Sequence, residues 1–147
     1  MNSFFMSLAL EEARLAFDAG EVPVGAVLVR GEQVLAQAHN RRETDRDPTA
    51  HAEMLALRAG AVALGTRRLT DCELYVTLEP CPMCAGAMVM AEVARCYFGA
   101  RDPRQGCCES VYALTREPSF YHRLPCVGGL MEQEAATLLS LFFQKRR

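Results

Sequence analysis

Long apolar runs and an excess of positive charge are both missing from this sequence of 147 residues. No apolar stretch approaches the roughly 18 residues needed to span a bilayer, and the first residues lack the basic segment, apolar run and cleavage site of a signal peptide. We therefore expect a cytoplasmic protein without membrane contact. The formal net charge of −2 and the isoelectric point near 5.9 argue against a protein that coats nucleic acid through bulk positive charge.

Lysine is nearly absent, because Lys145 is the only lysine among 16 basic residues and the others are arginines. Arginine pairs with phosphate through two parallel hydrogen bonds, and several arginines fall in segments that we expect to be loops. These arginines could contact phosphate, or they could simply be solvated side chains on exposed loops. From charge alone, the second explanation is favoured. The arginines in question are Arg41, Arg42, Arg46, Arg101 and Arg104.

Internal repeats, low-complexity tracts and Gly/Ser linkers are also missing. The length is usual for one compact domain, and a hydrophobic content of 50% supplies a core without disulfide bonds. The seven cysteines are an odd number in a compartment that we expect to be reducing. Metal ligation or burial therefore explains them better than a disulfide framework does. We expect a single domain over residues 1–147.

Helical and strand periods alternate along the chain. The first two expected strands flank a glycine-containing turn at residues 30–32 and predict a hairpin. Residues 39–49 are polar and predict a surface loop, and residues 99–123 are poorly periodic, with a short helix expected near residues 110–114. Strands alternating with helices predict a three-layer α/β fold. Helices are expected over residues 4–19, 51–64, 81–91 and 131–147, and strands over residues 24–29, 33–38, 72–78 and 93–98.

The most informative feature is a pair of short segments, His51-Ala52-Glu53 and Pro80-Cys81-Pro82-Met83-Cys84. Two cysteines at positions i and i+3 in the first turn of a helix point the same way, and the helix N-terminus lowers thiol pKa values. Cys81 and Cys84 therefore suit one metal ion, and His51 at the start of another helix supplies a third ligand. Three protein ligands leave one tetrahedral position of zinc for water, which is typical of a catalytic site.

A fourth protein ligand is not expected. His39 and His122 are isolated in the sequence. The other cysteines form no second pair at ligand spacing, and two adjacent cysteines diverge on most backbones. We therefore predict one zinc ion per subunit, in an open site. The cysteines excluded in this way are Cys72, Cys96, Cys107, Cys108 and Cys126.

Glu53 follows His51 by two residues, so it projects near the metal without binding it. A carboxylate in this position can take a proton from a zinc-activated water and pass it to the substrate. The combination of His-x-Glu with Pro-Cys-x-x-Cys is the signature of zinc deaminases that act on nucleobases. An ordinary helix start beside a small buried cysteine pair is the plain alternative, and the joint pattern disfavours it.

With these residues in place, the chain resembles the bacterial tRNA-specific adenosine deaminases from the first expected helix to the last. The resemblance implies a cytidine-deaminase-like fold, with three α/β/α layers around a central mixed sheet of about five strands. It also implies a homodimer that hydrolyses the C–N bond of a cyclic amidine, converting the wobble adenosine of a tRNA anticodon stem-loop to inosine. The segments that carry the resemblance are residues 21–29, 47–53, 77–81, 83–88, 98–102, 138–140 and 142–143.

The resemblance also implies substrate contacts by position. Asn40 contacts the flipped purine, Val24, Ala52 and Leu78 help to wall its pocket, and Asp102 touches the sugar-phosphate part of the RNA. Core packing equally explains Val24 and Leu78, and a turn equally explains Asn40. The zinc ligands and the proton carrier are those already named.

Three positions depart from the family pattern where the RNA would be read, namely Glu92, Glu109 and Tyr121. They leave open a shifted substrate, so a deaminase of a free purine base or nucleoside, similar to guanine deaminase, is the second hypothesis. Guanine deaminases usually carry a Pro-Phe-Gly run where residues 23–25 read Pro-Val-Gly. A non-catalytic, zinc-stabilised RNA-binding module is third, because it would leave Glu53 and the open zinc position without a role.

Overall fold

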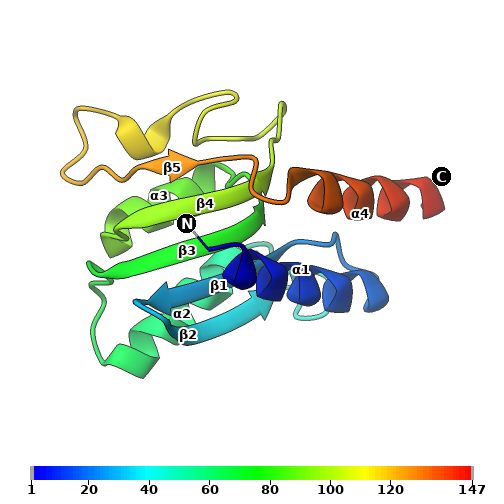
Figure 1. Cartoon of the computed structure of the whole chain (residues 1–147), viewed down its shortest axis with the longest axis horizontal. Helices are drawn as coiled ribbons and strands as arrows, with labels where there is room; N and C mark the ends of the chain where they lie inside the picture. The colour runs from blue at the N-terminus through cyan, green and yellow to red at the C-terminus, as the bar shows by residue number, and fades with distance from the viewer. Residues whose placement is uncertain (1, 147) are drawn as a thin grey trace.

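The computed structural model describes residues 2–146 and contains one five-stranded sheet, with strand order β2-β1-β3-β4-β5 (Figure 1). The β1–β2 and β1–β3 pairs are antiparallel, whereas β3–β4 and β4–β5 are parallel. The sheet is therefore mixed, as the resemblance implied. Its strands are β1 (Gly25–Arg30), β2 (Gln33–His39), β3 (Cys72–Leu78), β4 (Arg95–Ala100) and β5 (Cys126–Val127).

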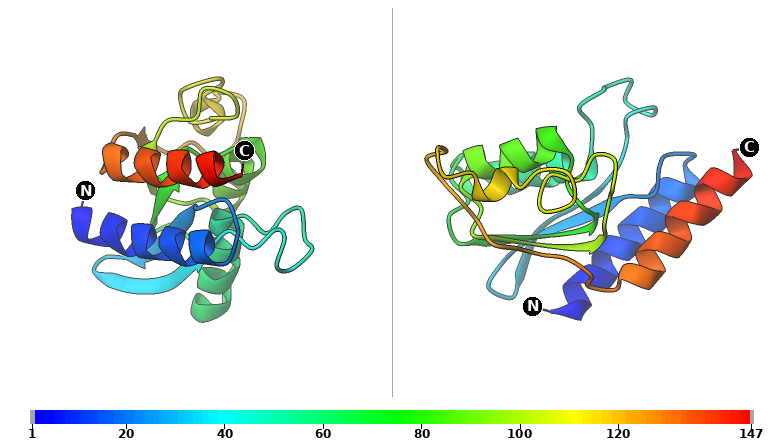
Figure 2. Two further views of the ribbon diagram at one scale, coloured as in Figure 1. Left: turned by 90° about the vertical axis from the view of Figure 1, so that its right-hand side faces the viewer. Right: turned by 90° about the horizontal axis from the view of Figure 1, so that it is seen from above.

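Helices cover both faces of this sheet (Figures 1 and 2). Helices α1 (Ser3–Asp18) and α4 (Glu132–Lys145) lie side by side on one face. Helices α2 (Ala52–Leu64) and α3 (Pro82–Ala91) contact each other on the opposite face. The predicted three-layer α/β/α fold is confirmed.

The central strands are buried on both sides because both sides carry helices. On β3, Leu74 and Val76 belong to the core cluster that also contains Ala56 of α2 and Met88 of α3. Tyr75, between them, belongs to the cluster on the side of α1. The alternation follows from the two-residue period of a strand, and because both faces are covered, the middle of β3 reads as three consecutive apolar residues, Leu74 to Val76.

Strand register gathers several chain ends at one edge of the sheet. Gly25, at the start of β1, pairs with His39 at the end of β2, and the next residue of β1 pairs with Val76 near the end of β3. Leu78 in turn pairs with Ala100, the last residue of β4. The segments that precede β1 and follow β2, β3 and β4 therefore meet at the same edge.

Three details of the second half of the chain differ from the expectations. The short helix expected near residues 110–114 is instead a 3₁₀ turn, η1 (Leu114–Arg116). The two-residue strand β5 was not expected, because so short a segment carries no readable period. The expected strand over residues 93–98 lies two residues further along, at β4. Within residues 2–146, no helix is long and apolar enough to cross a membrane.

Candidate metal centre and active site

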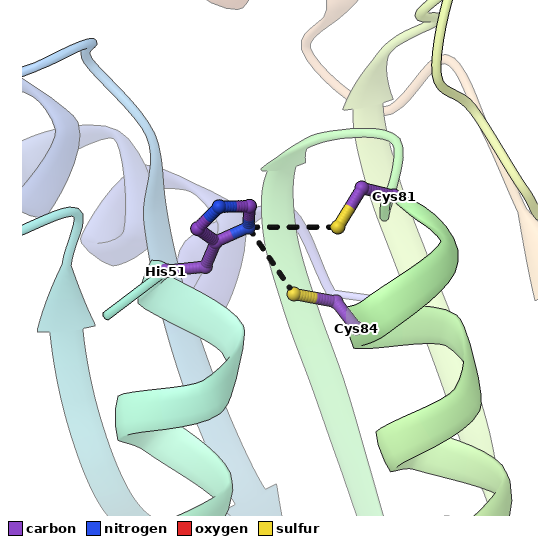
Figure 3. Close-up of side chains that lie close together, drawn as sticks. All are labelled: His51, Cys81 and Cys84. Carbon is purple, nitrogen blue, oxygen red and sulfur yellow. Dashed lines mark hydrogen bonds between the residues drawn. The ribbon is translucent and has the colours of Figure 1, made fainter. Parts of the chain in front are cut away.

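The three predicted metal ligands lie together between the first turns of two helices (Figure 3). The Nδ1 atom of His51 is 3.5 Å from the Sγ atom of Cys81 and 3.5 Å from that of Cys84. The imidazole projects from the start of α2, and both thiols come from the start of α3. The spacing seen in the sequence therefore brings one nitrogen and two sulfurs to a common point.

Local backbone structure leaves these side chains available. His51 and Cys81 are the N-caps of α2 and α3, yet neither side chain makes a capping hydrogen bond. Pro82 occupies the first turn of α3, where its missing N–H costs nothing. Hydrogen bonding with Cys84 and with His51 lowers the pKa of Cys81 to about 4, against burial, which acts to raise it. This thiol is ready to act as a thiolate ligand.

A zinc ion fits this donor set. One imidazole nitrogen and two thiolates are ligands that zinc accepts, and all ligand atoms of the group lie within 4.8 Å of one another. Within residues 2–146 no fourth His, Cys or carboxylate belongs to this group. The arrangement matches the three protein ligands of a catalytic site, which leave one position for water.

Glu53 is buried beside this group, with 4% of its surface exposed. Burial raises the pKa of its carboxyl group to about 7, because removal from water disfavours the charged form. A group that titrates near neutral pH can both accept and deliver a proton. The structure therefore provides a carboxyl group with the properties that a proton carrier needs, next to the metal position.

A cavity of about 1210 Å³ opens above the group, at the edge of the sheet where the chain ends gather. The flipped-base contacts expected from the sequence all line it, as does Asp102. Cys84 does not line it, because this thiol is fully buried beneath the other ligands. The expected residues on the cavity wall are Val24, Asn40, His51, Ala52, Glu53, Leu78, Cys81 and Asp102.

Asn40 and Asp102 also make local hydrogen bonds. The Nδ2 atom of Asn40 donates to the carbonyl of Val22 at 3.3 Å, and its Oδ1 accepts from the Arg42 amide at 3.3 Å. The Oδ1 atom of Asp102 accepts from the amides of Arg104 and Gln105 at 3.0 and 3.1 Å. These bonds fix both side chains in the cavity wall, so a local turn role is compatible with the expected substrate contact.

Glu79 is a site residue that the sequence did not reveal. Its buried carboxylate accepts hydrogen bonds from the amides of Asp102, Cys108, Glu109 and Ser110, and from the Ser110 hydroxyl. Burial acts to raise the pKa of Glu79, but these hydrogen bonds outweigh it and the pKa is lowered. The partners lie 23 to 31 residues further along the chain, so no local pattern announces them.

Gly106 allows the loop backbone to come close to the Glu79 carboxylate. A Cβ atom at this position would lie 2.4 Å from a carboxylate oxygen of Glu79 and 2.6 Å from the Asp102 carbonyl. Only glycine allows the backbone to approach the carboxylate this closely. Glu79 and Gly106 together fix the loop that carries Asp102 into the cavity wall.

Within the described residues, none of the other cysteines joins the predicted zinc ligands, in agreement with their exclusion as a fourth ligand, but three of them gather elsewhere in the fold. The Sγ atoms of Cys96, Cys108 and Cys126 lie within 4.8 Å of one another, in a second group that has the composition of a metal site. They come from β4, from the loop after Gly106 and from β5. Adjacent cysteines do diverge, because Cys107 is not a member of this group. Sequence spacing missed the group because β4 and β5 pair only in the fold.

Two of the three departures from the family pattern lie away from the cavity. Glu92 ends α3 at the opposite end from Cys81 and forms ion pairs with Arg67 and Arg68 at 3.9 and 3.4 Å. The Tyr121 hydroxyl donates to the carbonyl of Met90. Neither Glu92 nor Tyr121 lines the cavity.

Glu109 lies closer, because it forms an ion pair with the cavity-lining Arg101. Arg101 is also paired with Glu132, at 3.0 Å. This departure therefore offsets one positive charge at the rim.

Arginines from two loops do share one surface. Arg42 and Arg104 line the same cavity as Arg101, whereas Arg41 is paired with Asp45 at 3.0 Å. At the C-terminal end, Arg146 donates to the Gly20 carbonyl, and Arg147 lies outside the described residues. Within residues 2–146, Arg42 and Arg104 are the cavity-lining arginines for which no ion pair is found.

Comparisons with known proteins agree with this geometry. The model of the cytidine and deoxycytidylate deaminase zinc-binding region matches residues 1–100. The chain is 47% identical to the tRNA-specific adenosine deaminase of Bacillus subtilis over 99% of its own length and 91% of that protein. It is 46% identical to the enzyme of the same name from Aquifex aeolicus, over 99% and 96% of the two chains.

Solved structures of two kinds of deaminase are similar to this chain. A structure from work on A-to-I editing by tRNA:A34 deaminases at the wobble position is 45% identical, with a TM-score of 0.90 over 93% of this chain and 99% of that one. The guanine deaminase of Nitrosomonas europaea is 26% identical, with a TM-score of 0.80 over 97% and 84%. The chain belongs to the zinc-binding cytidine and deoxycytidylate deaminase family and, within it, to the tRNA-specific adenosine deaminases.

Proposed function

We propose that this chain hydrolyses the wobble adenosine of a tRNA anticodon to inosine, through one zinc-dependent deaminase domain that spans residues 1–147. One observation carries the proposal: a buried carboxyl group, Glu53, lies beside a His/Cys/Cys group at the base of a cavity whose rim carries arginines from two loops. The base of the cavity supplies the chemistry, and the rim suits a phosphate-bearing substrate.

His51, Cys81 and Cys84 would hold the zinc ion, which supplies an activated water to the site when bound. The water adds to C6 of adenine and the exocyclic amine leaves as ammonia, so adenosine and water give inosine and ammonia. Glu53 would carry one proton of the water to N1 of the adenine ring and the other to the leaving amine, so both protons of the water are placed. Burial raises the pKa of this carboxyl group to about 7. The group can therefore accept and release a proton near neutral pH.

Binding of the adenine requires that it leave the anticodon stack, at a cost of a few kcal/mol. Val24, Ala52 and Leu78 offer apolar surface around the extruded base. The amide of Asn40, held by the hydrogen bonds to Val22 and Arg42, offers polar contact to the purine edge. Phosphate contacts outside the pocket, from Arg42 and Arg104, offset the unstacking cost.

We also propose a cytoplasmic homodimer, built around the outer side of α3. A Cβ atom at Gly86 would meet no heavy atom within 4 Å, and Met90 on the same helix is 69% exposed. Small residues permit close approach of a second copy related by a two-fold axis. Light scattering at micromolar concentration should report a dimer, and a monomer would contradict this part of the proposal.

Incubation with an anticodon stem-loop that carries adenine at the wobble position tests the activity. We expect inosine at that position, detected by mass spectrometry of the digested RNA, and little ammonia from free adenosine or guanine. Asp102→Ala should damage the stem-loop reaction, and Asn40→Ala should damage reaction with any purine. Rapid release of ammonia from free guanine with no inosine in the stem-loop would instead assign the chain to the second hypothesis.

A further inference from the structure

The second cysteine group lies where three separate segments meet. The Cα atoms of Cys96 on β4 and Cys126 on β5 are partners in the parallel pairing of these strands. Cys108 reaches the same point from the loop that Glu79 holds. Cys96 and Cys108 belong to the core cluster beneath α3, together with Leu124. The three sulfurs thus converge between the sheet and the irregular segment that follows β4.

The surroundings of this group suit a metal ion. Cys96 and Cys108 are 0% and 1% exposed, whereas Cys126 is only partly buried and leaves an entry path. The hydroxyl oxygen of Thr115, a fully buried residue, lies 3.2 Å from the Cys126 sulfur. This oxygen can donate its hydrogen to a thiolate or serve as an oxygen ligand. Arg116 follows on the same turn and brings a positive charge close to the group.

We propose that Cys96, Cys108 and Cys126 bind a second metal ion, a thiophilic divalent ion of the zinc class, as a structural site separate from the catalytic one. Thiolates are the preferred ligands of such ions. Three sulfurs around one zinc ion, each at about 2.3 Å, lie about 3.8 Å apart, so the observed group needs only a small closure. The Thr115 hydroxyl, 3.2 Å from the Cys126 sulfur, lies within hydrogen-bond reach of that ligand.

A metal ion here would cross-link the least regular part of the chain. Between β4 and α4, the structure has only the short elements η1 and β5. The ion would fasten the loop at Cys108 and the strand at Cys126 to the sheet at Cys96. Because the Cys108 amide also donates to Glu79, the site would support the loop that carries Asp102 into the cavity wall.

Zinc counting tests the proposal on the full chain, expressed with zinc and purified under reducing conditions. Native mass spectrometry should find about two zinc ions per wild-type chain. Cys108→Ala should keep the catalytic zinc and lose the second ion. Cys72→Ala is the matched control, because Cys72 is equally buried on β3 and belongs to neither metal-type group, and it should keep both ions.

A second variant keeps the test independent of how Cys108→Ala folds. Replacing both His51 and Cys81 by alanine removes the catalytic site, and the remaining site should bind Co²⁺ with a thiolate-to-metal charge-transfer band. Adding Cys126→Ser should abolish that band. One zinc ion in the wild type and no cobalt band in the double variant would overturn the proposal. A Cys96–Cys126 disulfide found by mass spectrometry without reductant, with no second zinc ion, would also overturn it.

Discussion

The His51/Cys81/Cys84 group and the Cys96/Cys108/Cys126 group have similar dimensions but different origins. Two ligands of the first share one helix turn, and the third begins the neighbouring helix. Members of the second come from two strands and a loop that meet only through pairing of β4 with β5. The first group opens into a large cavity, whereas the second lies in the core beneath α3.

The two groups differ in the role that a bound metal ion could have, either in the reaction or in stabilising the fold. A metal at the first group has access to water and substrate, and a buried carboxyl group stands beside it. A metal at the second group would meet protein on almost every side, with no carboxyl group in the cluster. Access to the cavity and the neighbouring Glu53 are the features that support the proposed catalytic role of the first group.

We expect the largest loss of activity from substitution of Glu53, the buried carboxyl group that lies beside the first group only. Glu53→Gln keeps the size and hydrogen bonding of the side chain but removes the proton carrier. We expect the rate of inosine formation in a stem-loop to fall by about 10² to 10⁴-fold or more, while the zinc content stays that of the wild type. Single-turnover kinetics and elemental analysis measure the two quantities.

Retention of the wild-type rate in Glu53→Gln would show that another group carries the proton. Loss of zinc together with the rate would instead make Glu53 a ligand. Either result would contradict the proposal that Glu53 is a proton carrier beside the first group and not a metal ligand.

Ligand substitutions sharpen the same contrast. Cys81→Ser should abolish inosine formation because the catalytic metal is lost. Cys126→Ser should act mainly on stability and lower the midpoint of thermal unfolding by about 5 °C, because the proposed ion fastens β5 and the adjoining loop. Activity assays and thermal scans of both variants provide the comparison. A loss of activity in Cys126→Ser without a lower midpoint would contradict the supporting role.

Glu79 connects the two groups, since it precedes Cys81 by two residues and accepts the Cys108 amide. Glu79→Ala leaves several backbone amides without their acceptor, and we expect a loss of about 2 to 4 kcal/mol in the free energy of unfolding. Glu109→Ala is the control, because its exposed ion pair with Arg101 should contribute less than about 1 kcal/mol. Urea denaturation measures both. Equal losses in the two variants would refute the anchoring role of Glu79.

Sequence reasoning went furthest where function depends on local spacing. Residues 51–53 and 80–84 place three ligands and Glu53 because helix geometry fixes their relative directions. The roles of Glu79 and Cys126 could not be predicted from the sequence, because their partners lie far along the chain and are brought close only by the fold. The irregular segment after β4 could not be predicted for a related reason: hydrogen bonds from its backbone amides to the Glu79 carboxylate hold it, and such bonds leave no periodic pattern in the sequence.

A smaller effect concerns the loop on the other side of the cavity. Glu21 is buried and accepts from the Glu43 and Thr44 amides and from the Thr44 hydroxyl. Burial acts to raise its pKa, but these hydrogen bonds outweigh it and the pKa is lowered. A lowered pKa stabilises the fold above the unfolded-state value of about 4.3, and this contribution is lost as the pH falls through the folded-state value.

Comparison of the wild type with Glu21→Gln isolates this contribution. We expect the wild type to be more stable by about 1 to 2 kcal/mol at pH 7. The difference should shrink as the pH is lowered below about 4. Urea denaturation over this pH range measures it. A difference that stays constant with pH would show that the charge on Glu21 does not stabilise the loop.

Substrate competition distinguishes deamination of a tRNA anticodon from deamination of free purines. One reaction contains the wobble-adenine stem-loop together with free guanine and free adenosine, and inosine in the RNA and the free deaminated products are measured by mass spectrometry at two salt concentrations. We expect inosine in the stem-loop as the main product, with a rate that falls steeply as salt rises if Arg42 and Arg104 contact phosphate as proposed. Salt-insensitive deamination of free guanine or adenosine, with unmodified RNA, would contradict it.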